Sequence, residues 1–156
     1  MSEAVHAHKL AANIISQGMA EMTVRAEWSG EKVQSRLDWL DVELNVLVDL
    51  KTCADLDRFR FDIRDFGYVH QMAFYHNALK LAGHDTEGMR HYLIAVEKKE
   101  PFRVGVVEIL PGTIYDANNA PANSPNGAGT NAMIEELKGC RASGVWPTRY
   151  EELMKI

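Results

Sequence analysis

The alternation of apolar and polar residues in the first third of the chain predicts three consecutive strands. Apolar and polar side chains alternate over 21–28 and again over 32–41. A third run, LNVLVDLK over 44–51, is apolar almost to its end. The turns SGEK and DVE between these runs are too short for crossover connections, so we expect an antiparallel meander.

The rest of the chain predicts helices and two more strands. Helical periodicity indicates helices over 2–18, 68–83 and 131–140. Two further strands are predicted over 91–98 and 103–110. Residues 52–67 indicate a polar connector with helical character, and the Asn-, Ala-, Pro- and Gly-rich segment 117–130 indicates a loop. This order predicts one α/β domain over 1–156, with helices flanking a mixed central sheet.

Composition and charge change this picture little. Hydrophobic residues make up 46% of the 156 residues and charged residues 25%, which is typical of a globular protein. The net charge of −5 gives no overall attraction to nucleic acid or membrane, although a local basic groove is compatible with it. The apolar runs are too short for a membrane span, and MSEAVHAHKL is too polar for a signal peptide. Because Cys53 and Cys140 match no zinc or disulfide spacing, we expect a cytoplasmic protein without a membrane partner.

Charged residues at the end of the third predicted strand suggest chemistry. Asp49 and Lys51 are two residues apart and therefore point to the same face of a strand. A short turn would bring Asp38, near the end of the second strand, within reach of Asp49. Two carboxylates and the Leu50 carbonyl could hold Mg²⁺, while the lysine orients water and stabilises phosphorane charge. A strand-end charge pair with a surface aspartate is the alternative for so short a motif.

Longer motifs in the same region resemble a known family. The run SRLDWL…VLVDLKTCADLDRFRFDIRDFGYVHQMAFYHNAL is similar to the nuclease core of the RecE family, exodeoxyribonuclease VIII, within the PD-(D/E)XK superfamily. The similarity extends roughly from Ala20 to Leu110. It includes Gln71 and Tyr75 in the Q-x-x-x-Y spacing of these nucleases, which places both side chains on one helix face.

The resemblance implies a metal centre with a catalytic lysine. Asp38 and Asp49 would be the metal ligands, with the Leu50 carbonyl beside them. The metal would be Mg²⁺, with Mn²⁺ as a substitute. Lys51 would be the catalytic lysine that orients the attacking water.

The resemblance also implies three supporting residues. Gln71 and Tyr75 would support the site and contact the phosphate backbone, and ordinary helix packing is the alternative for both. Glu21 falls where relatives carry an acid on the strand before the aspartate. It would be an auxiliary carboxylate at the metal or, equally well, a solvated acid at a strand start.

One family feature has no match in this sequence. RecE-like nucleases carry a metal-ligating histidine well upstream of the first aspartate, and here only His6 and His8 are available. Histidines on an amphipathic helix are more often surface or packing residues, so we expect neither to be a ligand. The domain would then lack the first motif, with weaker chemistry as the consequence.

The function that the resemblance implies is a magnesium-dependent exonuclease. It would digest double-stranded DNA ends 5′ to 3′ in phage or prophage recombination, with a metal-bound water attacking the phosphodiester. A single-strand annealing recombinase would be its partner, and a homo-oligomer its assembly. A non-catalytic DNA-binding or assembly module of the same fold and an endonuclease are the alternatives. DNA binding would need a local basic surface. Its candidates are Arg25, Lys32, Arg36, Arg58, Arg60 and Arg64.

Overall fold

A computed structural model describes residues 1–125 and 127–147, so the predicted domain includes ten residues outside the described part. At its centre lies a five-stranded sheet in the order β1-β2-β3-β4-β5. The strands are β1 (Met19–Trp28), β2 (Glu31–Asp41), β3 (Val46–Cys53), β4 (Arg90–Glu97) and β5 (Val104–Ile109). Only β3 and β4 are parallel neighbours, and the other pairs are antiparallel. The predicted mixed sheet with an antiparallel meander is therefore confirmed.

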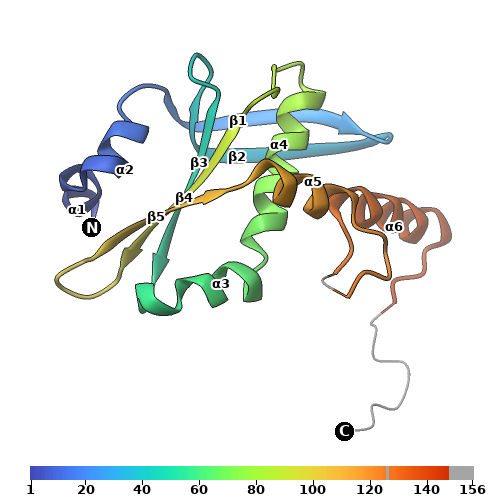
Figure 1. Ribbon diagram of the computed structural model, residues 1–156. Helices are drawn as coiled ribbons and strands as arrows, with labels where there is room; N and C mark the ends of the chain where they lie inside the picture. The colour runs from blue at the N-terminus through green and yellow to red at the C-terminus, as the bar shows by residue number, and fades with distance from the viewer. Residues whose placement is uncertain (126, 148–156) are drawn as a thin grey trace, which may run out of the picture.

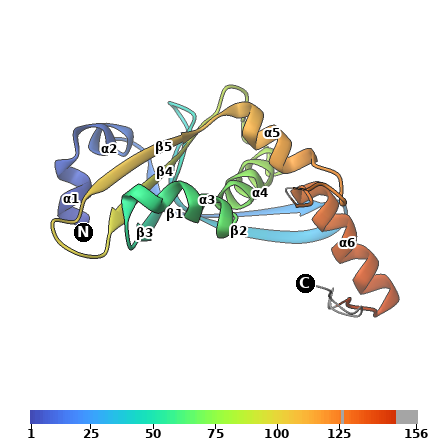
Figure 2. The ribbon, with the colours of Figure 1, turned by 60° about the horizontal axis from the view of Figure 1, so that its bottom comes forward.

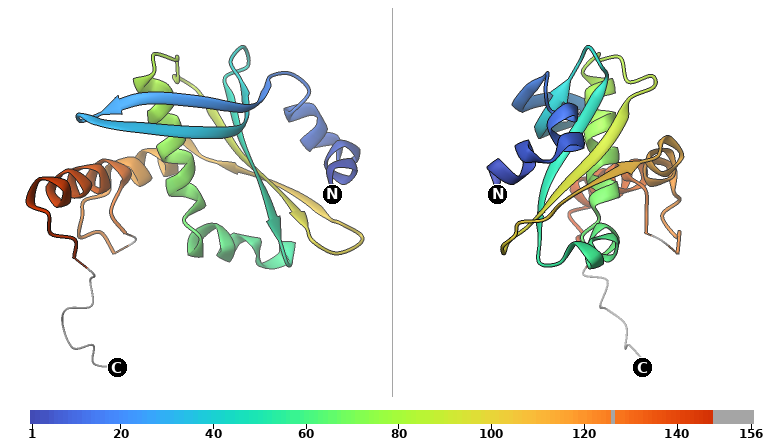
Figure 3. Two further views of the ribbon diagram at one scale, coloured as in Figure 1. Left: turned by 180° about the vertical axis from the view of Figure 1, so that it is seen from behind. Right: turned by 60° about the vertical axis from the view of Figure 1, so that its left-hand side comes forward.

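Helices cover both faces of the sheet (Figures 1 and 3). One face carries α1 (Ser2–Ala7) and α2 (Lys9–Ile14); the other carries α4 (Tyr68–Leu81), α5 (Pro111–Asn119) and α6 (Thr130–Ser143). The 3₁₀ turn η1 (Leu56–Arg58) and α3 (Phe59–Asp65) connect β3 to α4. None of the helices in the described ranges has the length and apolar character that a bilayer crossing requires.

The two covered faces explain the long apolar runs of β3 and β4. Leu47 and Leu93 pack under α4 in one core cluster. Val48 and Ile94, one residue further along each strand, pack in a second cluster with Val5 of α1. Strands that are buried on both faces have no polar alternation to show, which is why β3 reads as VLV before its charged end.

The pairing of β2 with β3 is short, and this positions the candidate site. It runs only from Trp39↔Val48 to Asp41↔Val46, whereas β1 and β2 pair along almost their whole length. The β1–β2 hairpin thus leaves the rest of the sheet and extends toward α6 (Figure 2). The separation of the two strands begins one residue before Trp39, at Asp38.

Two sequence-based predictions about helices need correction. The helix predicted over 2–18 is two helices, because His8 is extended (ψ 106) and its Nδ1 accepts a hydrogen bond from Ala11 N (3.2 Å) as the cap of α2. The loop predicted over 117–130 begins later, since α5 continues to Asn119. Helix α5 was missed because its second half, YDANN, has a composition typical of loops. Pro111 at its first position was the available signal.

We expect Gly18 to tolerate a side chain much less well than Gly83. Both have positive φ, +122° and +90°, so alanine is strained at either position. A Cβ at Gly18 would also lie 2.7 Å from the Leu40 carbonyl oxygen, whereas a Cβ at Gly83 meets nothing within 4 Å. Gly18→Ala should therefore lower the free energy of unfolding in urea by about 1–3 kcal/mol more than Gly83→Ala. Equal losses would show that β1 shifts freely at its start.

Candidate active site

The ammonium of Lys51 in β3 contacts three side chains. It forms an ion pair with Asp49, which is only 1% exposed. Lys51 Nζ also donates a hydrogen bond to Gln71 Oε1 of α4 (2.8 Å). The ring of Tyr68, at the first position of α4, lies with its centroid 4.4 Å from the same nitrogen. A carboxylate, an amide oxygen and an aromatic face together hold this half-buried cation in place.

Asp38 joins this group from β2, as the sequence predicts. Its Oδ2 accepts a hydrogen bond from the backbone N–H of Leu50 (2.7 Å). Continuing the β2–β3 register by one residue beyond Trp39↔Val48 places Asp38 opposite Asp49. Burial raises the pKa of Asp49, the hydrogen bond and charge of Lys51 lower it, and the neighbouring Asp38 carboxyl raises it again. Two carboxylates and one ammonium leave this cluster with one net negative charge.

Gln71 and Tyr75 also face the cluster. Gln71 Nε2 donates a hydrogen bond to Tyr75 Oη (2.6 Å) and lies 3.4 Å from Asp49 Oδ1. Burial raises the pKa of Tyr75, and its hydrogen bond from Gln71 lowers it. The net direction is upward, so the phenol is protonated at neutral pH. Its O–H has no acceptor among the described residues and is free to donate to a ligand.

The oxygen atoms at this site fit a hard divalent cation. Asp49 Oδ2 is buried and forms an ion pair with the Lys51 ammonium. The Leu50 N–H points at Asp38, and both peptide groups of a strand residue point to the same edge, so the Leu50 carbonyl lies on that side too. No three His, Cys, Asp or Glu side chains gather for a metal within 1–125 and 127–147. The fitting set is therefore two carboxylates and one backbone carbonyl, all oxygen ligands.

Glu21 and the upstream histidines are placed differently. Glu21 has positive φ (57°), and its side chain is 60% exposed. Its carboxylate forms an ion pair with Arg36 Nε at 2.8 Å. Its role as an auxiliary ligand stays a prediction. His6 and His8 belong to α1 and its C-cap, on the sheet face opposite α4. The structure thus places neither histidine beside Asp38 and Asp49.

Tyr68 is the site residue that sequence reasoning missed. The motif GYVHQMAFY drew attention to Gln71 and Tyr75, but Tyr68 precedes Gln71 by three residues and shares its helix face. The i, i+3, i+7 spacing of positions 68, 71 and 75 is therefore the sequence signal for Tyr68. Phe66 also contacts the Tyr68 ring in a tilted arrangement, with centroids 5.7 Å apart.

The family is decided by the sequence profile. Residues 1–154 match the profile described as "PDDEXK-like domain of unknown function". The chain belongs to this family. The resemblance to the PD-(D/E)XK superfamily that its motifs indicate is therefore confirmed.

The fold of this PDDEXK-like domain recurs in solved structures. A candidate exonuclease from Eubacterium rectale superposes with a TM-score of 0.69 at 15% sequence identity, over 99% of this chain and 60% of that one. The protein SSO0001 gives a TM-score of 0.48 at 14% identity, over 91% of this chain and 58% of its own. This chain thus spans about three fifths of each. At these identities the first likeness shows the fold alone. Among curated proteins, no sequence match was found.

We expect Asp49→Asn to stabilise the PDDEXK-like domain while removing a carboxylate from the site. The raised pKa of Asp49 means that the folded state disfavours its charged form at neutral pH. The variant should therefore have a higher free energy of unfolding at pH 7 in the presence of a chelator. The gain should shrink as the pH falls through the raised pKa of the folded state, and it should vanish well below 3.8, the ordinary pKa of aspartate, where the wild-type carboxyl is neutral in both states.

Urea unfolding of both proteins at several pH values measures this difference. Asp65→Asn, on an exposed acid that pairs with Arg64, is the matched control and should change stability little. A destabilised Asp49→Asn at pH 7 would mean that the Lys51 ion pair outweighs the burial of the carboxylate.

Proposed function

We propose that this PDDEXK-like domain is a metal-dependent deoxyribonuclease that digests double-stranded DNA from its ends. The observation that carries the proposal is the buried ion pair of Asp49 and Lys51, with the Asp38 carboxyl beside it. Removing charges from water is costly, and an apolar pair would serve packing as well. Buried carboxylates with perturbed pKa next to a lysine are typical of catalytic sites.

Asp38, Asp49 and the Leu50 carbonyl would hold the metal, Mg²⁺ or Mn²⁺. When bound, the ion supplies positive charge that polarises the scissile phosphate and makes water easier to deprotonate. The net negative charge of the cluster favours such a cation. The short β2–β3 pairing leaves the edge of β3 at Leu50 open on the side where Asp38 approaches.

Lys51, Gln71 and Tyr75 would act on the phosphate itself. Lys51 presents positive charge where negative charge develops on the phosphoryl oxygens and orients the attacking water. Gln71 fixes the lysine through its Oε1 and fixes the tyrosine through its Nε2, so one amide sets the spacing of both. Tyr75 keeps its proton and donates its free O–H to a phosphate oxygen.

Exposed basic side chains supply the surface for DNA. Arg36 lies close enough to lower the pKa of Tyr75, which places a cation at the border of the site. Arg25 and Lys32 follow along the protruding β1–β2 hairpin, and Arg58 and Arg60 lie where the chain runs from β3 to α4; all are exposed. A duplex held between the hairpin and α3 would contact these residues through its phosphates.

The finer details rest on the resemblance to RecE-like exonucleases. It supports digestion 5′ to 3′ in phage or prophage recombination, with a single-strand annealing recombinase as partner. It also supports a homo-oligomer. Duplexes labelled at the 5′ or 3′ end would give the direction, and sedimentation would give the assembly.

The first test is cleavage of linear and closed-circular duplex DNA by the purified chain. We expect loss of the linear DNA alone in Mg²⁺ or Mn²⁺, and no loss with a chelator. Lys51→Ala should reduce the rate on the order of 10²–10³-fold, the usual loss when one transition-state charge partner is removed. Lys99→Ala, on an exposed lysine of the β4–β5 turn, is the matched control and should cleave like wild type.

Each other outcome selects an alternative. Loss of both DNA forms would indicate an endonuclease. DNA binding without cleavage, by a folded chain in either metal, would indicate a non-catalytic module of the same fold. Cleavage that survives Lys51→Ala would remove the lysine from the mechanism.

Tyr68 should act as a positioning residue through the face of its ring. Tyr68→Phe keeps the aromatic face under the Lys51 ammonium and should keep the cleavage rate within about twofold. Tyr68→Leu removes it and should slow cleavage about tenfold, the equivalent of a cation–π contact of 1–2 kcal/mol. Equal rates for the two variants would show that the ring only fills space. Circular dichroism of both variants confirms folding.

A further inference from the structure

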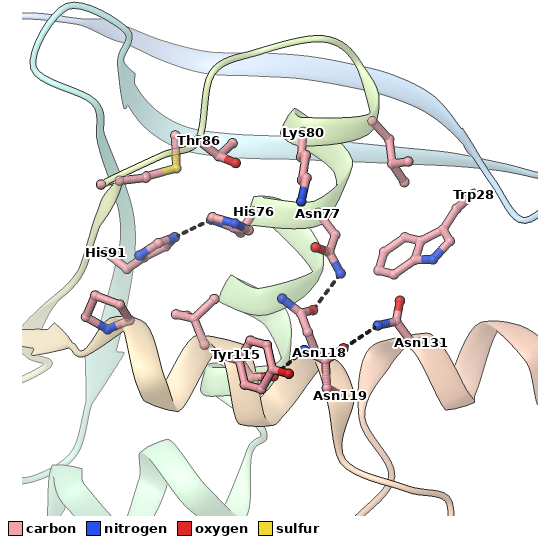
Figure 4. A pocket seen from close by; sticks show the side chains of 15 residues that line it. Trp28, His76, Asn77, Lys80, Thr86, His91, Tyr115, Asn118, Asn119 and Asn131 are labelled. Carbon is pink, nitrogen blue, oxygen red and sulfur yellow. Dashed lines mark hydrogen bonds between the residues drawn. The ribbon is translucent and has the colours of Figure 1, made fainter.

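A second site lies on the other flank of α4. His76, Asn77 and Lys80 line a pocket of about 520 Å³ between α4, α5 and the start of α6 (Figure 4). Trp28, the segment just before β4 and His91 of β4 close its remaining sides. The pocket is separate from the proposed nuclease site, because neither Asp38, Asp49, Lys51 nor Gln71 lines it.

The charge of the pocket wall is unusual for this chain. Among the described residues, the wall contains Lys80 and two histidines but no aspartate or glutamate, although the whole chain has a net charge of −5. Lys80 is exposed and forms no ion pair or hydrogen bond with any described residue. An unpaired ammonium in a concave, carboxylate-free wall attracts an anion.

A half-buried histidine, His76, and a buried one, His91, border this cation. His76 Nδ1 and His91 Nε2 lie 3.0 Å apart, and His91 is 1% exposed with no partner for its Nδ1. Burial lowers the pKa of His91 to about 4, with a further contribution from His76. Burial, and then the charge of Lys80, lowers the pKa of His76. Both rings are therefore neutral at pH 7 and serve as hydrogen-bonding groups, while Lys80 carries the charge.

Asparagine side chains from α4, α5 and α6 line the pocket, and hydrogen bonds between them fix their orientations. Asn118 Oδ1 accepts from Asn77 Nδ2 (2.7 Å) and from Thr130 Oγ1 (2.5 Å). Asn119 Oδ1 accepts from Asn131 Nδ2 (3.1 Å). These bonds leave the oxygens of Asn77 and Asn131 and the amide nitrogen of Asn118 available, and Figure 4 shows all three side chains at the pocket. Fixed amides with both donors and acceptors suit the edge of a nucleobase.

We propose that this pocket binds a mononucleotide, with its phosphate at Lys80 and His76 and its base against the asparagine wall. Trp28 and Ile114 supply apolar contact area for the ring. The volume of the pocket falls in the range of small-molecule sites. The inference goes beyond the proposed nuclease activity, since it uses different residues and requires neither metal nor DNA.

The test is calorimetric titration of the full chain, in chelator, with each of the four 2′-deoxynucleoside 5′-monophosphates. We expect at least one to bind with a stoichiometry of one. Lys80→Gln should weaken that binding about tenfold or more, because it removes a charge-assisted contact with the phosphate. Asn131→Asp, which adds a carboxylate to the wall at an exposed position, should weaken it as well. Lys99→Gln makes the same charge change far from the pocket and should bind like wild type.

Two further titrations identify what the pocket recognises. The matching deoxynucleoside without phosphate should bind at least tenfold more weakly, and inorganic phosphate alone should compete only weakly. Absence of binding by all four monophosphates, or binding unchanged by Lys80→Gln, would overturn the proposal. Binding in a chain that cleaves no DNA would leave the pocket standing and remove only the nuclease activity.

Discussion

The candidate site depends on one local constraint, which is that β2 separates from β3 after three residue pairs. A continued ladder would place Leu37 opposite Leu50 and occupy the Leu50 peptide groups with backbone hydrogen bonds. Because the strands separate, the Asp38 side chain satisfies the Leu50 N–H instead. The Asp38 carboxylate thus takes the place of a backbone acceptor on β2, and the Leu50 carbonyl remains available to a cation. The turn behind this point is fixed by Asp41, whose Oδ1 accepts from Glu43 N and Leu44 N (2.9 Å each).

The same separation explains why charged side chains can stay buried there. Lys51 satisfies its ammonium with Asp49, Gln71 and the Tyr68 ring, so its desolvation is compensated. Asp49 is less well compensated, since burial and the Asp38 carboxyl both raise its pKa. The unfavourable electrostatic free energy is therefore concentrated in the Asp38 and Asp49 carboxylates, and a proton or a cation would reduce it.

Much of this arrangement could be predicted from the sequence, because it follows from strand periodicity and short turns. The short connection between two predicted strands was enough to bring Asp38 to Asp49. What could not be predicted depends on single backbone choices. Positive φ at Glu21 turns its carboxylate to Arg36, and the extended conformation of His8 divides the first helix. Gly67, the N-cap of α4 just before Tyr68, is left-handed (φ 64°), and no hydrophobic periodicity predicts that angle.

Helix α4 couples the two sites by its rotation. Gln71 and Tyr75 face the carboxylates, while His76 and Lys80 follow on the adjacent flank and face the pocket. The rotation between these flanks is fixed by the buried stripe of Met72, Ala73, Ala78 and Leu79, all 0% exposed, which packs on the sheet. All side chains of a helix move together when the helix rotates about its axis. A rotation of α4 that moved Lys80 toward a ligand would therefore move Gln71 away from Lys51. Because the alanines bring α4 close to the strands, such a rotation would create clashes in the core. Each site is therefore held in its geometry by the packing that serves the other.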